Sequence, residues 1–348
     1  MKETMKVAAI VETGRIEVKE VARPVPGPGQ IRMKITGCAI CTWEQRMFTG
    51  DSHMPLPFVG GHEVAGMVDA VGEGVDPKEF PAGKKIVARL INSCGKCYYC
   101  RHGEENLCVE LNKIDDSQME IPGTGGMGEY LNVYEEQVYF IPDDLSVERA
   151  VFAEPLACVV TSVGKGGVGL GDDAVVIGGG IMGMLHVLCL KLKGARVIMS
   201  EPDEARRKLA LELGADLAFD PLAQDPVEYV KSLTEGRGAD AVFNTTPVSA
   251  VAKQAVDMTG PMGRCVMYSS QHPDKPIEVS PNMMHNSEKI ITGSVSPGVE
   301  AFHRSVSLIS KGLIRTDELV SGVFPVDEAE EAFRTAVRPD TFRVVITF

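Results

Sequence analysis

The stretch "VVIGGGIMGML", residues 175–185, joins a run of β-branched apolar residues to a glycine turn and then to a helical pattern. Its glycines follow the spacing G-x-G-x-x-G, at Gly178, Gly180 and Gly183. In such a turn the first glycine permits the tight bend, the second lets the backbone approach a pyrophosphate, and the third lets helix and strand pack closely. The helix N-terminus then faces the anion. The motif predicts a dinucleotide site; the alternative is a glycine turn without a ligand.

An acidic residue follows at the distance that this kind of site needs. Glu201 closes the next apolar run, about 20 residues after the glycines, where a carboxylate binds the ribose 2′-OH and repels a 2′-phosphate. This favours NAD over NADP, although the nearby Arg206 and Arg207 leave NADP open. The residues that we expect to contact the cofactor are Gly178, Gly180, Ile181, Met182, Gly183, Glu201, Arg206, Thr245 and Thr246.

The chain around this motif changes in character near Ser146. Before it, short bursts of Val, Ile, Gly and Pro indicate short strands and turns, which is typical of an all-β, barrel-like unit. After it, strand and helix patterns alternate, which favours a doubly wound parallel sheet. Two helical patterns and a closing strand end the chain, and we expect them to return to the first domain. The predicted domains are residues 1–150 with 288–348, and an inserted domain of residues 151–287.

Composition limits the classes of partner. The formal net charge of −13 argues against a nucleic-acid binder, because neutralising phosphates needs a basic face. The apolar residues 174–190 contain three glycines and His186, so we interpret them as a strand, a turn and a buried helix rather than a membrane span. Glu3 precedes any apolar run, and nine clustered cysteines favour a reducing compartment. We therefore expect a cytoplasmic protein that acts on small molecules.

Four of the nine cysteines lie within fifteen residues, in "SCGKCYYCRHGEENLC". Four thiolates on one loop can close a tetrahedron around zinc and leave no position for water or substrate. A structural zinc lobe at about residues 92–110 is therefore predicted. An iron–sulfur cluster or unpaired thiols are the alternatives. The proposed ligands are Cys94, Cys97, Cys100 and Cys108.

A second group of metal-binding residue types is dispersed along the chain. Cys38 and Cys41 are three apart in "TGCAICTWEQR", and they could be a redox pair, metal ligands or core thiols. His62 lies in "VGGHEVAG", and a lone histidine is usually structural. Glu154 lies in apolar surroundings, where an unpaired carboxylate is costly. Cysteine, histidine and glutamate together can form a catalytic zinc site with an open fourth position.

These motifs together resemble the medium-chain, zinc-dependent alcohol dehydrogenase family over essentially the whole chain. The resemblance rests on the Gly61-His62-Glu63 run, the four-cysteine lobe, the glycine motif and Glu154-Pro155-Leu156. It implies a GroES-like catalytic domain with an inserted Rossmann domain, and a homodimer or homotetramer. It also implies Cys41, His62 and Glu154 as catalytic zinc ligands, with Glu63 as an exchangeable or water-linked ligand. The Glu-Pro-Leu form is closer to the sorbitol and threonine dehydrogenase branch.

The sequence departs from this family just after Cys41. The family usually continues Gly-(Ser/Thr)-Asp, whose hydroxyl passes the alcohol's proton outward, whereas this chain continues Thr42-Trp43-Glu44. An indole N–H donates a hydrogen bond but cannot accept a proton. Water, Glu44 acting directly, or Thr42 could replace the relay, and we favour water. Glu44 more naturally orients His62, and Trp43 either lines the pocket or simply packs.

The resemblance implies hydride transfer between NAD and a secondary alcohol, on a polyol, sugar or related polar substrate. The residues expected around the reacting atoms are Trp43, Glu44 and Glu63. Because the relay hydroxyl is missing, a second hypothesis is that the protein is a carbonyl reductase, or an internal redox lyase, epimerase or cyclase. A non-catalytic zinc and dinucleotide sensor is the third, and the open metal position argues against it.

Overall fold

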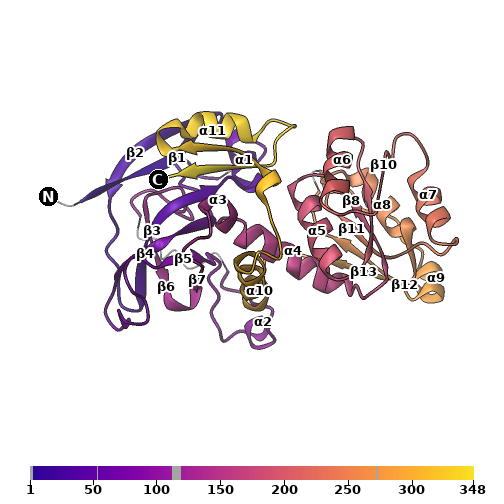
Figure 1. Ribbon diagram of the computed structural model, residues 1–348, viewed down its shortest axis with the longest axis horizontal. Helices are drawn as coiled ribbons and strands as arrows, with labels where there is room; N and C mark the ends of the chain where they lie inside the picture. Colours follow the sequence, from indigo (N-terminus) through magenta and orange to yellow (C-terminus); the bar gives the residue numbers. More distant parts are fainter. Residues whose placement is uncertain (1–2, 53, 112–118, 272) are drawn as a thin grey trace. The chain divides into compact units, whose positions relative to one another are not determined.

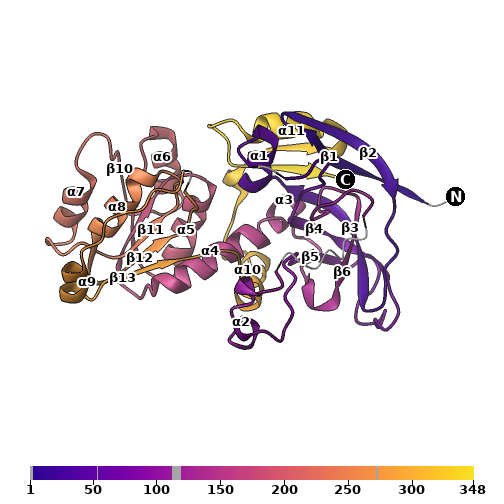
Figure 2. The same cartoon turned by 180° about the vertical axis from the view of Figure 1, so that it is seen from behind.

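The computed structural model describes residues 3–52, 54–111, 119–271 and 273–348. The chain divides into two compact units, Met1–Ala157 with Gly298–Phe348, and Cys158–Pro297 (Figures 1 and 2). The sequence placed the end of the inserted domain at residue 287, before β13 (Ile290–Gly293), which belongs to the sheet of the second unit. Four residues are too few for a strand pattern to be recognised, which accounts for this difference.

The second unit is built on a six-stranded parallel sheet with the order β10-β9-β8-β11-β12-β13. Its other strands are β8 (Asp173–Ile177), β9 (Arg196–Ser200), β10 (Leu217–Phe219), β11 (Ala239–Asn244) and β12 (Thr259–Met267). Its helices are α5 (Ile181–Leu192), α6 (Glu204–Glu212), α7 (Pro226–Leu233), α8 (Ser249–Met258) and α9 (Pro281–Ser287). The strand order reverses between β8 and β11, which is where doubly wound sheets bind ligands. The predicted parallel α/β sheet is confirmed.

The apolar residues 174–190 form β8, the glycine turn and most of α5, as predicted. All residues of β8 are buried, and Gly194 ends the following helix with φ +77°, a left-handed conformation that suits glycine. Among the described residues, no helix combines the length and the apolar character that crossing a bilayer requires.

The first unit contains a hairpin of β1 and β2 and a seven-stranded sheet. The sheet has the order β14-β15-β3-β4-β5-β7, and β6 pairs with β3. The strands are β1 (Thr4–Glu12), β2 (Arg15–Ala22), β3 (Gln30–Ala39), β4 (Glu63–Val71), β5 (Lys85–Ala88), β6 (Tyr130–Tyr134), β7 (Val138–Phe140), β14 (Val320–Pro325) and β15 (Arg343–Thr347). The short strands predicted from the Val, Ile and Gly pattern are therefore present.

Short helices border this sheet. They are α1 (Thr42–Thr49), α2 (Tyr98–Arg101), α3 (Val147–Ala150), α10 (Val299–Ser310) and α11 (Ala329–Ala336), with α4 (Ala153–Gly166) containing the boundary between the units. The 3₁₀ turns are η1 (Glu105–Leu107), η2 (Glu135–Gln137), η3 (Asp317–Leu319) and η4 (Val326–Glu328). In α11, Ala329, Ala332, Phe333 and Ala336 are buried, the i, i+3, i+4, i+7 stripe of a helix that packs on a core.

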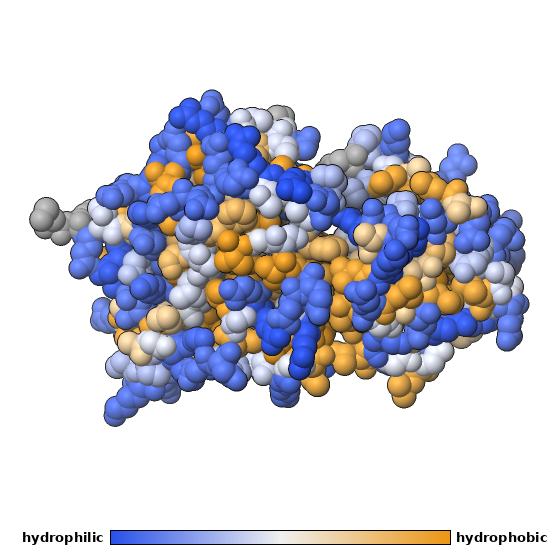
Figure 3. All heavy atoms as spheres, turned by 45° about the horizontal axis from the view of Figure 1, so that its top comes forward, coloured by the Kyte–Doolittle hydropathy of each residue, from blue (hydrophilic) through white to orange (hydrophobic). Residues whose placement is uncertain are grey.

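Hydrophilic side chains are spread over both units on the face that Figure 3 shows, with hydrophobic ones between them. This agrees with the 24% of charged residues and with the net charge of −13.

Candidate functional site

Strand pairing brings three distant segments to one end of the first unit's sheet. Ala39 of β3 lies opposite Glu63 of β4 and opposite Val345 of β15. Cys41 follows β3 and is the N-cap residue of α1, with an extended backbone. Arg343 opens β15. Cys41, Glu63 and Arg343 therefore meet because their strands are neighbours, although they are far apart in the sequence.

Glu44 fixes the ring of His62. The Glu44 side chain is fully buried, and its Oε1 accepts hydrogen bonds from the backbone N–H of Gly61 and from His62 Nδ1, both at 2.9 Å. The glycines before His62 make this possible, since a Cβ on Gly60 would lie 2.7 Å from Glu44 Cγ. Burial alone would raise the pKa of the Glu44 carboxyl, but His62 and the Gly61 N–H hold it below its ordinary value. The His62 ring is thereby oriented with Nε2 available to a ligand.

Glu63 is held by a buried ion pair that the sequence analysis missed. Its Oε1 lies 2.5 Å from Nη2 of Arg343, and both side chains are almost completely buried. Burial raises the pKa of the Glu63 carboxyl to about 7, although Arg343 acts in the opposite direction. In the sequence, the indication of this buried pair was the charged Arg343 at the start of the otherwise apolar strand "FRVVITF".

The donor atoms of Cys41, His62 and Glu63 all lie within 4.8 Å of one another. Glu63 Oε2 is buried and has no hydrogen-bond partner among the described residues. A thiol, an imidazole and an orphaned carboxylate oxygen are ligand types that zinc takes, so these residues fit the ion. Glu154, in the first turn of α4, is also buried, and its charge acts on Glu63 and Arg343. It is outside the group of three, and its role as a ligand stays a prediction.

Aromatic rings border this group. The Trp43 ring packs edge-on against Phe58, with 5.7 Å between centroids, and against His62, at 6.0 Å. About a third of Trp43 (36%) remains exposed, so its packing is incomplete. The neighbouring Thr42 is exposed and Glu44 is buried. Trp43 therefore lies beside His62 of the candidate metal group, and its role in lining a substrate pocket stays a prediction.

Cys38 lies within the core of the first unit. Its thiol is fully buried, and a Cβ on Gly61 would lie 2.7 Å from its Sγ. Burial raises the pKa of this thiol well above its ordinary value, which disfavours redox chemistry. Both Cys38 and Cys41 are free.

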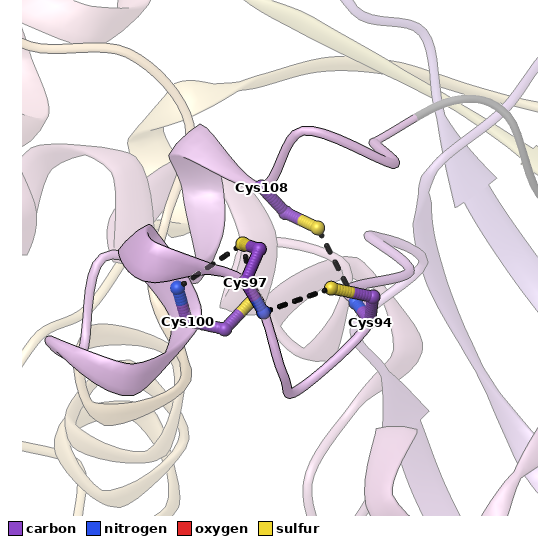
Figure 4. A group of neighbouring side chains, drawn as sticks. All are labelled: Cys94, Cys97, Cys100 and Cys108. Carbon is purple, nitrogen blue, oxygen red and sulfur yellow. Dashed lines mark hydrogen bonds between the residues drawn. The ribbon is translucent and has the colours of Figure 1, made fainter.

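The four cysteines of the predicted lobe converge (Figure 4). Their sulfur atoms lie within 4.8 Å of one another, as one tetrahedral metal site requires. Backbone N–H groups point at the sulfurs: that of Cys97 donates to Cys94 Sγ and that of Cys94 to Cys108 Sγ, both at 3.3 Å. The N–H of Cys100 lowers the pKa of the Cys97 thiol to about 6. The N–H of Cys94 likewise lowers the pKa of the Cys108 thiol, whereas burial raises the pKa of the Cys100 thiol to about 12. The backbone N–H groups therefore favour thiolates, the form that binds metal, at Cys97 and Cys108.

The glycine turn of the second unit has the expected geometry. Gly178 has φ +100°, and a Cβ on Gly183 would lie 1.8 Å from the carbonyl oxygen of Gly178. Only glycine fits either position. Gly180 is the N-cap of α5 with φ −74°, and among the residues that the structure describes only Arg206 comes within 4 Å of the place of a Cβ there. The second glycine is therefore not needed for packing, which leaves its open face to a ligand. Ile181 and Met182 begin the helix.

Glu201 lies over this turn. Its Oε2 accepts a hydrogen bond from the Gly179 N–H at 2.5 Å, and its Oε1 accepts one from Asp203 at 2.8 Å. Arg207 donates to the carbonyl oxygens of Glu201 and Pro202. Arg207 therefore binds the backbone, whereas Arg206 is the arginine that lies beside Gly179 and Gly180.

The hydroxyl groups of the two threonines after β11 make hydrogen bonds within the protein. Thr245 Oγ1 donates to the carbonyl oxygen of Ile177 at 2.8 Å, and Thr246 Oγ1 to Asn244 Oδ1 at 3.2 Å. Thr245 thus ties the end of β11 to the end of β8, at the reversal of strand order. Contact of either threonine with a cofactor stays a prediction.

Comparison with known proteins agrees with this geometry. The model of the alcohol dehydrogenase GroES-like domain matches residues 27–143, and the model of the zinc-binding dehydrogenase matches residues 182–311. An L-threonine 3-dehydrogenase from Thermococcus kodakarensis is 30% identical over 94% of this chain and 93% of that enzyme. The chain belongs to the zinc-dependent, medium-chain alcohol dehydrogenase family. The predicted family and GroES-like fold are confirmed.

Other members of the alcohol dehydrogenase family are equally similar over their full length. A sorbitol dehydrogenase from Halalkalibacterium halodurans is 29% identical over 96% of both chains. The crystal structure of a zinc-binding dehydrogenase from Sinorhizobium meliloti, bound to NADP, is 29% identical, with a TM-score of 0.90 over 99% of this chain and 100% of that one. The predicted zinc-dependent dehydrogenase is thereby confirmed, and the sorbitol and threonine branch stays a prediction.

Proposed function

We propose that this alcohol dehydrogenase transfers a hydride between NAD and a secondary alcohol of the polyol, sugar or related polar class. The observation that carries the proposal is the convergence of Cys41, His62 and Glu63, with one buried carboxylate oxygen left without a partner. The metal would be held by Cys41 and His62, with Glu63 and Glu154 as the acidic ligands. The sorbitol and threonine dehydrogenases among its relatives support an alcohol that carries further polar groups.

The residues around Cys41, His62 and Glu63 would hold and orient these metal ligands. Zinc, when bound, supplies a Lewis acid that lowers the pKa of a hydroxyl group. Glu44 holds the His62 ring so that Nε2 is presented, and Arg343 holds one oxygen of Glu63 so that the other stays directed away from that pair. The four-cysteine lobe is a second, structural metal site, because four thiolates leave no open position.

The second unit would bind the cofactor at its glycine turn. NAD supplies the hydride acceptor. Gly180 leaves room for the pyrophosphate, and the Glu201 carboxylate favours a free ribose 2′-OH over a 2′-phosphate. Arg206 and the NADP held by the Sinorhizobium meliloti relative are the reasons to test both cofactors.

The proton of the alcohol would leave by way of water. Trp43 occupies the position of the usual hydroxyl and cannot accept a proton. Glu44 is fully buried, and its Oε1 already accepts two hydrogen bonds. Direct proton transfer to Glu44 would weaken its hold on His62, which favours water. Trp43 and Phe58 would form an aromatic wall against which a sugar face can stack.

A panel of polyols, sugars and hydroxy acids, run with NAD and with NADP, tests the proposal through the absorbance of the reduced nicotinamide. We expect turnover with NAD on at least one secondary alcohol. His62→Ala should abolish turnover and leave NAD affinity unchanged. Trp43 is the single tryptophan, so its fluorescence should respond to removal of the metal in wild type but not in His62→Ala. Turnover that survives in His62→Ala would overturn the proposal.

A second function deserves a test because Trp43 replaces the relay hydroxyl. An internal redox enzyme, such as an epimerase or cyclase, oxidises its substrate and later returns the hydride to it, so the alcohol need not release a proton to solvent. Stopped-flow absorbance separates the two functions. The dehydrogenase releases free NADH in proportion to product, whereas the internal redox enzyme converts substrate without net NADH.

Finer assignments follow from the same proposal. The unit of Met1–Ala157 with Gly298–Phe348 would be the catalytic domain, and the unit of Cys158–Pro297 the cofactor domain. We also propose a cytoplasmic homodimer or homotetramer, since the nine free thiols suit a reducing compartment. Light scattering after size exclusion measures the oligomeric state.

A further inference from the structure

A hollow of about 460 Å³ lies at the amino ends of strands in the second unit. Among the residues that line it, Arg237 lies two residues before β11, Thr259 opens β12 and Lys289 directly precedes β13. These strands are parallel, so their amino ends share one edge of the sheet. The glycine turn follows the carboxyl end of β8, which is parallel to β11. The hollow is therefore at the opposite edge of the sheet from the proposed cofactor site.

Lys289 is a cation of this wall that forms no ion pair among the described residues. Its Nζ donates to a neutral acceptor, the Val256 carbonyl oxygen, at 3.2 Å. Burial lowers the pKa of its ammonium group; Asp257 opposes this effect, and Lys231 and Lys253 add to it. Asp257 is itself engaged, because Lys253 Nζ donates to both of its carboxylate oxygens. Lys289 is thus a partly buried ammonium group that a bound anion would stabilise.

The other charged residues that line the hollow each have a partner of opposite charge or cap a helix. The pairs are Glu228–Lys231 at 3.1 Å, Arg237–Asp240 at 2.9 Å, and Asp257–Lys253. Asp225 caps α7, where its Oδ1 accepts hydrogen bonds from two backbone N–H groups. The charge of the wall that is left without compensation is therefore the positive charge of Lys289.

The acidic side of the hollow offers acceptors for hydroxyl groups. The hydrogen bonds of the Asp225 side chain use Oδ1, and the Lys231 Nζ donates to Oε1 of Glu228. The second oxygen of each carboxylate can accept a hydrogen bond from a ligand. These carboxylates would repel a ligand with many negative charges. A ligand with one anionic group and several hydroxyl groups satisfies both sides.

We propose that this hollow binds a small hydroxylated organic anion, with its phosphate or carboxylate group at Lys289. The proposal adds a second ligand site to the enzyme and does not depend on the proposed reaction. A sugar phosphate and a sugar acid share the required chemistry, and they differ only in the group that Lys289 would bind.

Calorimetric titration of the full-length protein with glucose 6-phosphate, gluconate and glucose tests the proposal. At least one of the two anions should bind about tenfold or more tightly than glucose, and the one that binds identifies the anionic group. Lys289→Met should weaken its binding by about tenfold or more, the loss expected of a hydrogen bond to a charged group. Lys289→Arg keeps the charge and should retain most of the affinity. Added salt should weaken the binding, because it screens the attraction.

A matched control separates loss of this site from a general loss of charge. Lys208→Met removes an exposed lysine of the same unit that pairs with Glu204 at 2.7 Å, and it should bind the anion as wild type does. Circular dichroism checks that each variant is folded. Binding at the metal group of the first unit would survive Lys289→Met, so the two sites are told apart. Equal affinity for glucose and both anions, or equal affinity in Lys289→Met and wild type, would refute the site without affecting the proposed function.

Discussion

Arg343 and Glu63 form an ion pair that is almost completely removed from solvent, with Nη2 and Oε1 separated by 2.5 Å. The arginine opens β15 and the glutamate opens β4, so the contact depends on both strands pairing with β3. The pair uses one carboxylate oxygen, and Oε2 has no partner among the described residues. Arg343 thus neutralises the carboxylate and leaves one oxygen beside Cys41 and His62.

Replacing Arg343 should therefore destabilise the fold strongly. Arg343→Met leaves the Glu63 carboxyl unpaired in the interior, a change that costs about 3–5 kcal/mol when one partner of a buried pair is removed. Urea denaturation of wild type and variant gives the change in the free energy of unfolding. The double variant Glu63→Gln/Arg343→Met should lose less than the sum of the two single variants, because no charge is left unpaired. Additive losses would contradict the buried pair.

Glu44 provides a test of how His62 is held. Glu44→Gln keeps the volume of the side chain but replaces a charged acceptor with a neutral one. Zinc affinity at the Cys41 and His62 group should fall by about 10–100-fold, as for other groups that orient a metal-binding histidine. Chelator competition measures the affinity, and circular dichroism checks that the variant is folded. Unchanged zinc affinity would mean that Glu44 is not needed to orient the ring.

Two glycines of the same motif should respond differently to alanine. A Cβ at Gly183 would lie 1.8 Å from a backbone carbonyl oxygen, so Gly183→Ala should destabilise the second unit by about 1–3 kcal/mol or more. Gly180 has an ordinary φ and open space, so Gly180→Ala should leave stability nearly unchanged. It should still weaken NAD binding by about tenfold or more, because the methyl group occupies the path of the pyrophosphate. Calorimetric titration and urea denaturation measure the two effects, and unimpaired NAD binding by Gly180→Ala would argue against this binding mode.

His186 of α5 should make the protein sensitive to acid. The ring is fully buried, with Nδ1 donating to the Met182 carbonyl oxygen and Nε2 accepting from the Ser162 hydroxyl. Burial lowers the pKa of His186 to about 4, below its ordinary value near 6.5. Below about pH 6.5 the unfolded chain binds a proton that the folded protein does not, so stability falls as the pH drops from about 6.5 to 4. The loss attributable to His186 is about 3 kcal/mol.

The variant His186→Gln isolates this contribution. Gln does not titrate, so its free energy of unfolding should depend less on pH than that of wild type between pH 7 and 4.5. Urea denaturation at several pH values gives both curves. Parallel curves would show that His186 does not titrate differently in the folded and unfolded protein.

Local patterns were sufficient to predict much of the architecture. The glycine spacing predicted the β8–α5 turn, in which Gly178 has a positive φ. The cysteine spacing predicted a cluster that does converge. These predictions were correct because the residues that determine each structure lie within a few positions of one another in the sequence.

Features that depend on distant partners were not predicted. Arg343 reaches Glu63 only through the pairing of β15 with β3, which no local pattern encodes. The strand β13 is too short to show alternation. Sequence analysis therefore identified the candidate ligands but not the charges that surround them.

The most direct test of the central claim is the zinc content of freshly purified wild type and of Cys41→Ala protein, measured by elemental analysis. Wild type should contain about two zinc ions per chain and the variant about one, with alcohol-dependent NADH formation only in wild type. Equal zinc content in the two proteins, together with retained NADH formation in the variant, would contradict it.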